Sequence, residues 1–345
     1  MCRLTSSTSH PRARTESGLT GLETRISQAT GVPSHTTRHQ TCKQPLRDSC
    51  DDLYIVSHNL RGAKGSFDPD GCTRDLNKFE VLARLMTENN IDIYLLQETW
   101  LLDDWTTNIH GITVIHHGPK EPASNRGSGG VAIMLEPRAQ HAWHDAGSPD
   151  PYRPGNIVDN TTRYMGIELL FRPRKNQKTT LFVDCVYAPY SEMETNHPGI
   201  IRKFYETVEN HLLHLPSTTT PILGGDFNAS VGVRPPAHHD PVIGPYGLPH
   251  SNAAGETLTD MARNCSLQAS ATYFKHRSYE TFYDLRNNRA PRQLDLIFVH
   301  QKHGMHVTDA GVFQPRNNVV SDHHTSHPSQ TPSCSQSIQE QEQTR

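Results

Sequence analysis

The sequence predicts an α/β domain with substantial β-sheet, arranged as two sheets, on three observations. All 24 aromatic residues lie between Tyr54 and Phe313, and the polar ends at 1–52 and 325–345 contain none. The 272 residues between these ends alternate short apolar runs with helical patterns, as α/β and α+β domains do. No linker-like stretch interrupts them. We therefore expect one folded domain at 53–324, between a disordered polar N-terminal segment and a disordered Ser/Gln-rich tail.

Ten short runs rich in apolar residues are the expected strands. Ten short strands spread over a domain of this size suit a two-sheet arrangement. The expected strands are Leu53–Ser57, Ile91–Leu96, Ile112–His116, Val131–Leu135, Tyr164–Phe171, Thr180–Tyr187, Pro221–Asp226, Leu267–Phe274, Gln293–Val299 and Val307–Phe313.

Three segments repeat apolar residues at three-to-four spacing and are expected to be helices. The third begins near Ser251 or Asn252, which are suitable N-caps. Residues 138–160 are rich in Pro, Asp and His, and residues 232–250 are rich in Pro and Gly. Both segments are expected to be surface loops. The repeating residues are Leu76, Phe79, Leu82, Leu85 and Met86, then Ile201, Phe204, Val208, Leu212 and Leu215, then Leu258, Met261 and Ala262.

Composition argues against several classes of protein. No run approaches the roughly 18 apolar residues that span a bilayer, so we expect no integral membrane protein. The N-terminus lacks the apolar stretch of a secretory signal, and Pro11 favours a disordered tail over a transit peptide. The seven cysteines form no CxxC pair, and Cys185 lies in an apolar run, so we expect a reducing compartment and no structural zinc. The net charge of −3 indicates no broad basic stripe for non-specific DNA binding.

Polar residues collect where the expected strands end, which is where α/β folds commonly place their sites. Taken singly, each has an ordinary structural explanation, such as a solvated turn residue or a cap. Asp226 and Asn228 lie two apart, and in extended chain such residues face the same way and can address one ligand. Gly224 and Gly225 allow close approach of the backbone. The polar residues are Asn59, Glu98, Tyr187, Asp226, Asn228 and Asp295, followed by Ser321-Asp322-His323.

Taken together and in this order, the motifs Asn, Gln-Glu, Tyr-x-Pro, Gly-Asp-Phe-Asn, Leu-Asp and Ser-Asp-His resemble the endonuclease/exonuclease/phosphatase superfamily. The resemblance covers about 53–324 and is closest to the endonuclease domain of non-LTR retrotransposons, relatives of the apurinic/apyrimidinic repair endonucleases. The Gly-Gly-Val-Ala-Ile run at 129–133 supports it, as does Thr281-Phe282, 14 residues ahead of Asp295.

The resemblance implies a four-layered α/β sandwich, with two packed mixed sheets flanked by helices and an active site at one rim. It also implies hydrolysis of phosphodiesters with Mg²⁺, for which Mn²⁺ can substitute. This chemistry suits the residue types, because the anionic transition state needs added positive charge and fixed donors. Mg²⁺ prefers oxygen ligands.

The resemblance also implies a role for each polar residue. Glu98 and Asp322 would bind the metal ion, and Asn59 and Asn228 would position the ion's water and the phosphate. Asp226 would orient or deprotonate the attacking water. The remaining roles are donation to the scissile phosphate by Tyr187 and His323, orientation of the His323 ring by Asp295, and substrate contact by Thr281 and Ser321.

The sequence departs from the family after Ser321-Asp322-His323. Family members continue into an apolar strand, whereas here His324 leads into the Ser/Gln-rich tail. The final strand is therefore expected to be missing or replaced, which could expose side chains whose burial is worth about 1.5–3 kcal/mol each. The reverse transcriptase of a full retroelement is also not present in the sequence. A truncated or mis-joined chain derived from such an element would explain both departures.

Three functions follow from the resemblance. The first is a Mg²⁺-dependent endonuclease that nicks DNA inside the cell, in the nucleus if it is functional, although no basic nuclear signal stands out. The second is an inactive remnant that at most binds nucleic acid. The third is a phosphodiesterase of the same superfamily that acts on a phosphoinositide or a phospholipid. DNA is the expected partner of the first, and no membrane or obligate protein partner is implied.

Overall fold

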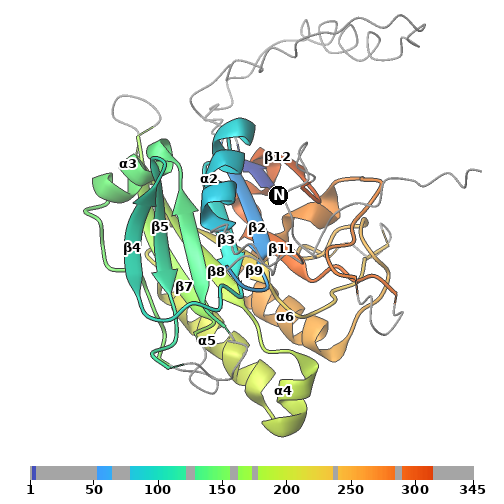
Figure 1. The fold of residues 1–345 in the computed structure, drawn as a ribbon. Coiled ribbons are helices and arrows are strands. Elements are labelled where there is room, and N and C mark those ends of the chain that lie inside the picture. Colours follow the sequence, from blue (N-terminus) through green and yellow to red (C-terminus); the bar gives the residue numbers. More distant parts are fainter. Residues whose placement is uncertain are drawn as a thin grey trace, which may run out of the picture.

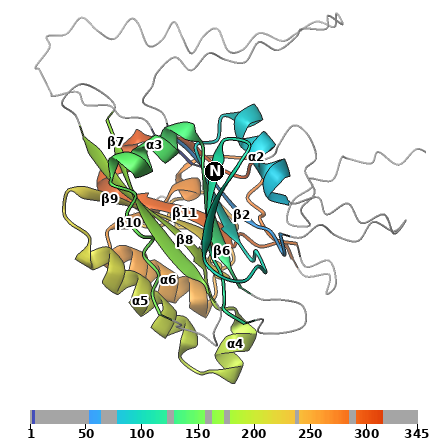
Figure 2. The same cartoon turned by 60° about the vertical axis from the view of Figure 1, so that its left-hand side comes forward.

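The computed structural model of the chain describes residues 2–4, 53–63, 78–121, 129–155, 162–172, 178–235, 240–283 and 290–313. These residues form two β-sheets that pack face to face, with helices on their outer faces (Figures 1 and 2). The predicted α/β sandwich of two sheets flanked by helices is confirmed.

One sheet has seven strands and the other has five. In spatial order the seven are β12 (Val307–Ala310), β1 (Cys2–Leu4), β2 (Leu53–Asn59), β3 (Ile93–Gln97), β6 (Val131–Leu135), β5 (Ile112–His117) and β4 (Trp105–Ile109). The five are β10 (Leu267–Ala269), β11 (Asp295–His300), β9 (Thr219–Asp226), β8 (Thr179–Tyr187) and β7 (Tyr164–Phe171). Each sheet is mixed, because β2–β3 and β8–β9 are parallel pairs among antiparallel ones.

The helices are α2 (Lys78–Asn89), α3 (Pro137–Asp145), α4 (Ser191–Asn196), α5 (Ile200–His214) and α6 (Ala253–Asn264), with 3-10 helices η2 (Ser270–Tyr273) and η3 (Gln301–His306). Helix α3 contacts β7 of one sheet and β5 and β6 of the other, and its buried alanines join the apolar cluster between the sheets. Helices α5 and α6 lie side by side on the outer face of the five-stranded sheet, and α2 covers the outer face of the other sheet (Figures 1 and 2).

Three apolar clusters hold these layers together. The central one lies between the sheets and includes Leu95 and Ile133 from one sheet and Val183 and Ile222 from the other. The other two lie under α5 and α6 and under α2. Successive residues of β3 alternate between clusters, since Leu95 packs centrally and Leu96 packs against the α2 side. Each fully buried aliphatic side chain contributes about 1.5–3 kcal/mol.

Local signals explain where two helices lie. Helix α5 buries Phe204 and Val208 on its sheet-facing side, as the apolar spacing predicted. Asn252 is the N-cap of α6, and its Oδ1 accepts a hydrogen bond from the Gly255 N–H at 2.8 Å. One of the two predicted caps is therefore confirmed.

Several elements differ from the prediction. Strand β4 and helix α4 were not predicted, and α3, which begins at Pro137, occupies the first part of the 138–160 stretch that was expected to be a loop. Glu136 caps this helix with Pro137 at its first position, a favourable arrangement that opens a helix. The expected strand at Leu267–Phe274 ends at Ala269, where η2 begins.

Strand β1 occupies a position next to the first predicted strand. Cys2–Leu4 lies between β2 and β12 and is antiparallel to both. The segment 1–52 was expected to be disordered. These three residues differ from that expectation because they form backbone pairs with two strands, β2 and β12. Residues 5–52, and the segment in which the final strand was expected to be missing, lie outside the described residues.

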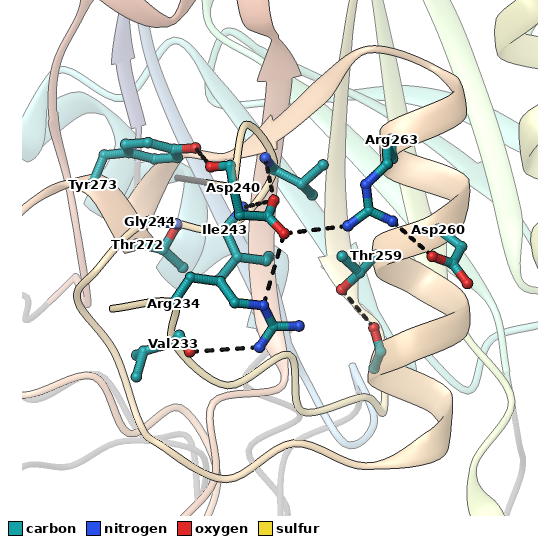
Figure 3. A network of polar contacts seen from close by, with 12 residues as sticks. Val233, Arg234, Asp240, Ile243, Gly244, Thr259, Asp260, Arg263, Thr272 and Tyr273 are labelled. Carbon is teal, nitrogen blue, oxygen red and sulfur yellow. Dashed lines mark hydrogen bonds and ion pairs between the residues drawn. The ribbon is translucent and has the colours of Figure 1, made fainter. Parts of the chain in front are cut away.

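The loop before α6 is fixed by one carboxylate, Asp240 (Figure 3). Its Oδ1 accepts hydrogen bonds from the backbone N–H groups of Val242 and Ile243, at 2.7 and 3.1 Å. Its Oδ2 lies 3.2 Å from a guanidinium nitrogen of Arg263 on α6 and 3.7 Å from Nε of Arg234. This end of the 232–250 loop is therefore tied to the helix that follows it.

Two further features bear on the sequence predictions. Within the described ranges no helix combines the length and apolarity needed to cross a membrane. Cys185 and Cys265 are buried free thiols, and the side chain of Cys185 packs between the two sheets, as its apolar run predicted.

Candidate active site

Asn59 joins two carboxylates at the rim of the sandwich. It is the last residue of β2 and pairs with Gln97 of the parallel strand β3, so Glu98 follows immediately beside it. Its side-chain Nδ2 donates hydrogen bonds to Glu98 Oε1 at 2.7 Å and to Asp226 Oδ2 at 2.8 Å. Asn59 is almost fully buried, so both bonds fix the carboxylates relative to each other.

Glu98 lies in a turn of unusual backbone conformation. Its φ is +51° and that of Trp100 is +55°, in the left-handed region that side chains seldom adopt. The turn is held because the Gly62 N–H donates to the Glu98 carbonyl at 2.7 Å and the Trp100 N–H donates to the Gly129 carbonyl at 3.1 Å. The indole Nε1 of Trp100 donates to Glu98 Oε2 at 3.2 Å. Both carboxylate oxygens of Glu98 are therefore oriented.

A buried pair of side chains supports the same turn. His116 Nε2 lies 2.8 Å from the Thr99 hydroxyl, and its Nδ1 lies 2.8 Å from the Asp103 carbonyl oxygen. The ring stacks on Trp105 at 4.6 Å. Burial lowers the pKa of His116 to about 4, so the neutral ring connects the residue after Glu98 to β5.

Asp226 ends β9, and Gly225 before it allows two strands to approach. A Cβ atom at Gly225 would lie 1.9 Å from the Val186 carbonyl oxygen, which excludes a side chain there. Asp226 Oδ1 accepts a hydrogen bond from the Asn228 N–H at 2.9 Å. Together with the bond from Asn59, each oxygen of this buried carboxylate has a donor.

Asn228 differs from the extended conformation assumed for the Asp226-Asn228 pair. Its φ is +47°, and its Nδ2 donates to the Ala188 carbonyl at 2.9 Å. The backbone N–H of Asn228, rather than a side chain on the same face, is what contacts Asp226. The expectation from strand alternation is wrong at this residue because the chain turns after β9.

Tyr187 lies on the other side of Asp226. It ends β8 and occupies the position paired with Asp226 in the parallel register. Its ring is buried, and the charge of the Glu98 carboxylate acts on its hydroxyl. Burial and the charge of Glu98 raise the pKa of Tyr187 far above its usual value, so the phenol is a neutral donor at the rim.

Asp295 faces Asp226 from the antiparallel strand β11. The Thr281 hydroxyl accepts hydrogen bonds from the N–H groups of Leu294 and Asp295, at 2.8 and 3.0 Å, so Thr281 fixes the start of β11. Burial first, and then the charge of Asp226, raise the pKa of Asp295 well above its usual value. Its Oδ1 is buried and has no hydrogen-bond partner among the described residues.

The site thus collects negative charge in a buried place. Burial raises the pKa of Asp226 to about 6, with a further contribution from Glu98, although hydrogen bonds from Asn228 and Asn59 oppose the shift. Carboxylates crowded in this way repel each other when ionised. A cation would relieve this repulsion, and carboxylate oxygens such as those of Glu98 are the ligands that Mg²⁺ prefers, so the donor chemistry fits Mg²⁺.

Some of the predicted residues cannot be placed. Ser321, Asp322 and His323 lie outside the described residues, and with them half of the predicted metal ligands. Among the residues that are described, no group of three or more His, Cys, Asp or Glu side chains is arranged to hold a metal ion. The residues that the structure brings together are Asn59, Glu98, Tyr187, Asp226, Asn228, Thr281 and Asp295.

Sequence reasoning missed three neighbours of the site. Trp100 lies two residues after Glu98, and its nearness in the sequence to the Gln97-Glu98 motif was the available signal. His116 ends an expected strand and was one of 22 histidines. Arg163 precedes an expected strand, and its guanidinium stacks on Tyr187 with Cζ 4.4 Å from the ring centroid. No pattern in the sequence distinguishes it from a solvated arginine.

Comparison with known proteins identifies a family that covers most of the chain. Residues 56–323 match the model of the Endonuclease/Exonuclease/phosphatase family. Craniofacial development protein 2 from Tragulus javanicus is 25% identical over 247 residues, which are 71% of this chain and 38% of that protein. The chain therefore spans less than half the length of this curated relative.

Two solved structures are similar to the chain at low identity. The APE2 catalytic domain from Xenopus laevis is 16% identical, with a TM-score of 0.48, over 73% of this chain and 83% of its own. The 3′-5′ exonuclease NExo from Neisseria meningitidis is 16% identical, with a TM-score of 0.45, over 74% of this chain and 90% of its own.

Proposed function

The chain belongs to the endonuclease/exonuclease/phosphatase family, and on that premise we propose that it is a Mg²⁺-dependent endonuclease that nicks DNA. One observation carries the proposal: the Asn59 amide joins the Glu98 and Asp226 carboxylates at 2.7 and 2.8 Å. A buried amide that orients two carboxylates is costly unless each hydrogen bond is made, and here it prepares acidic oxygens for a cation and a water.

Mg²⁺, or Mn²⁺ in its place, would be held by Glu98 and Asp322. When bound, the ion would supply positive charge to the phosphate and to the charge that develops in the transition state. The two oriented oxygens of Glu98 suit this role, because Mg²⁺ needs only one or two carboxylates besides water and substrate oxygens.

Asp226 is the proposed general base. Its pKa of about 6 leaves it ionised at neutral pH and close to the range in which a carboxylate can accept a proton from water. Asn59 and the Asn228 N–H hold its two oxygens, so the group is oriented before substrate arrives. Asn228 positions this region through its own bond to Ala188.

Tyr187 is the proposed donor to the scissile phosphate. It ends β8 beside Asp226, and a phosphate oxygen at the rim would offer its hydroxyl an anionic acceptor. His323 would also donate to the scissile phosphate, with Asp295 orienting its ring; this pair is assigned by the family resemblance. Ser321 and Thr281 would contact substrate, and Thr281 also holds β11 in place.

DNA is favoured over a phosphoinositide or a phospholipid by an arginine–aromatic cluster beside Asn59. Arg61 lies 5.4 Å, and Arg292 5.1 Å, from the centroid of the Phe282 ring. Trp100 next to Glu98 is 38% exposed. Arginines and exposed rings suit a ligand that carries both phosphates and bases. An origin in a non-LTR retrotransposon is the finer proposal, and it rests on the 129–133 and Thr281-Phe282 motifs.

The test uses supercoiled plasmid and the full chain. We expect conversion to nicked circle with Mg²⁺ and none with EDTA, with no hydrolysis of phosphatidylinositol phosphates under the same conditions. Circular dichroism and thermal melting on the same preparation show whether the chain is folded. Cleavage of the lipid but not of DNA would contradict the DNA assignment. A folded chain that cleaves neither would favour the alternative of an inactive, nucleic-acid-binding remnant.

A further inference from the structure

A buried arginine packs against the proposed phosphate donor. Arg163 directly precedes β7 and is only 5% exposed. Its guanidinium lies over the face of the Tyr187 ring, with Cζ 4.4 Å from the centroid. The two residues are also linked through the backbone, because the Tyr187 N–H donates to the Arg163 carbonyl at 2.7 Å.

The guanidinium reaches past Tyr187 to the chain that follows β8. Its Nη1 lies 3.4 Å from the carbonyl oxygens of both Tyr187 and Ala188, and its Nη2 lies 3.2 Å from the sulfur of Met193 on α4. The flat face of the guanidinium therefore stacks on the Tyr187 ring, while its two Nη groups contact the chain after β8 and Met193. Lysine lacks this planar geometry.

We propose that Arg163 is a positioning residue that acts through Tyr187: it fixes the ring by stacking and adds positive charge beside the hydroxyl that donates to the substrate phosphate. The proposal rests on the proposed function of Tyr187. It goes further in assigning a role to a residue that carries none in the sequence motifs.

Electrostatics agree with this geometry. Burial and Glu98 raise the pKa of Tyr187, and the positive charge of Arg163 acts in the opposite direction. The same charge opposes the rise in the pKa of Asp226. A cation beside a ring in a desolvated place interacts more strongly than one at the surface. Arg163 thus brings buried positive charge to a site crowded with carboxylates.

A purely structural role is the competing explanation. Arg163 could simply fill space and tie β8 to α4, in which case replacing it would lower stability and every measured property together. A double-mutant cycle separates the two explanations, because a residue that acts through Tyr187 has little left to act on once the Tyr187 hydroxyl is removed.

The cycle combines Arg163→Met and Arg163→Lys with Tyr187→Phe. We expect Arg163→Met to lower kcat roughly tenfold, the loss of one desolvated cation–ring contact, with little change in KM. Arg163→Lys should retain part of the rate, and neither change should lower the rate of Tyr187→Phe by more than about twofold. Arg172→Met, at the far end of β7, is the matched control and should leave kcat unchanged.

A spectroscopic measurement decides the question independently of catalysis. The chain is labelled with ¹³C at Cζ of tyrosine, and the Tyr187 signal is identified by its loss in Tyr187→Phe. We expect Arg163→Lys to shift this signal and Arg172→Met to leave it in place. If the chain shows no nuclease activity, the proposed function fails, but this signal still reports whether Arg163 orients Tyr187.

Two outcomes would overturn the proposal. One is an equal loss of kcat from Arg163→Met in the wild-type and Tyr187→Phe backgrounds. The other is an unchanged Tyr187 signal in Arg163→Lys. If Arg163→Met does not fold, the Arg163→Lys arm of the cycle gives the same comparison.

Discussion

Asp226 on β9 and Asp295 on β11 occupy paired positions of the five-stranded sheet, and the pKa of both carboxyl groups is raised. Burial is the main cause for each; the charge of Asp226 adds to the rise in the pKa of Asp295, and the charge of Glu98 adds to the rise in the pKa of Asp226. Ionising both acids in the absence of a cation therefore destabilises the folded site. A site arranged in this way gains stability from any cation that its oxygens can bind.

Mg²⁺ is accordingly expected to stabilise the chelated protein. A ligand that binds only the folded state at ten times its Kd adds about 1.4 kcal/mol, which for a domain of this size corresponds to a rise in Tm of about 2–4 °C. Differential scanning fluorimetry with and without MgCl₂ measures the shift. Glu98→Gln should reduce it.

The matched control for the metal experiment is Glu206→Gln, which removes an exposed carboxylate from α5. Its response to Mg²⁺ should equal that of the wild type. An identical shift in Glu98→Gln would place the cation elsewhere and contradict the role assigned to Glu98.

His116 makes the fold sensitive to acid. Its pKa is lowered to about 4 in the folded state by burial, against about 6.5 in an unfolded chain. The unfolded state therefore binds more protons below pH 6.5, and the stability due to the neutral ring is lost as the pH falls from about 6.5 to 4. By linkage the loss is about 3 kcal/mol.

Urea unfolding at pH 7.5 and at pH 4.5 measures this dependence. His116→Gln removes the titration and should lose less stability between the two pH values than the wild type. His141→Gln, an exposed change on α3, should lose as much as the wild type. Equal losses in all three proteins would show that His116 does not cause the sensitivity.

Asp184 is a buried carboxylate away from the site, and it predicts the opposite pH dependence. Burial raises its pKa to about 8, and His211 lies 3.7 Å from its Oδ1. The folded state holds a proton that the unfolded state releases near pH 4, so stability falls as the pH rises toward 8. Asp184→Asn should be more stable than the wild type at pH 8.5, with a gain that shrinks toward pH 4.5. A constant gain at both pH values would argue against this origin.

Gly225 tests the close approach of β8 and β9. Gly225→Ala would place Cβ 1.9 Å from the Val186 carbonyl oxygen, and because backbone must move to admit it, we expect a loss of about 3 kcal/mol or more. At Gly155 nothing lies within 4 Å of an added Cβ, so Gly155→Ala should change stability by less than about 0.5 kcal/mol. Equal melting temperatures for the two variants would contradict the geometry at β9.

The sequence predicts strands well where both faces of the sheet are covered. β6 has the predicted bounds, because a strand between two apolar layers is a nearly uninterrupted apolar run. β7 also has the predicted bounds, although it is an edge strand. β4 escaped prediction because its three central residues, Thr106 to Asn108, are exposed at the sheet edge. β1 escaped it because three residues far from the rest of the sheet carry no periodicity.

The site was predictable to the extent that strand ends meet at one rim. This principle brings Asn59, Glu98, Tyr187 and Asp226 together. It fails at Asn228, where the backbone turns into the left-handed region. The meeting of strand ends does not predict that Arg163 and His116 lie near the site. Their burial depends on tertiary packing, which no local pattern in the sequence indicates.

We propose that the Asn59–Glu98–Asp226 group performs metal-dependent cleavage of DNA. The most direct test is the nicking rate of supercoiled plasmid with Mg²⁺ for the wild type, Asp226→Ala and Asp184→Asn, each shown to be folded by thermal melting. Loss of a general base predicts a fall of about 10²–10⁴-fold in Asp226→Ala, and Asp184→Asn should stay within about twofold of the wild type. Equal nicking by Asp226→Ala and the wild type would contradict the account, as would a folded wild type that does not nick.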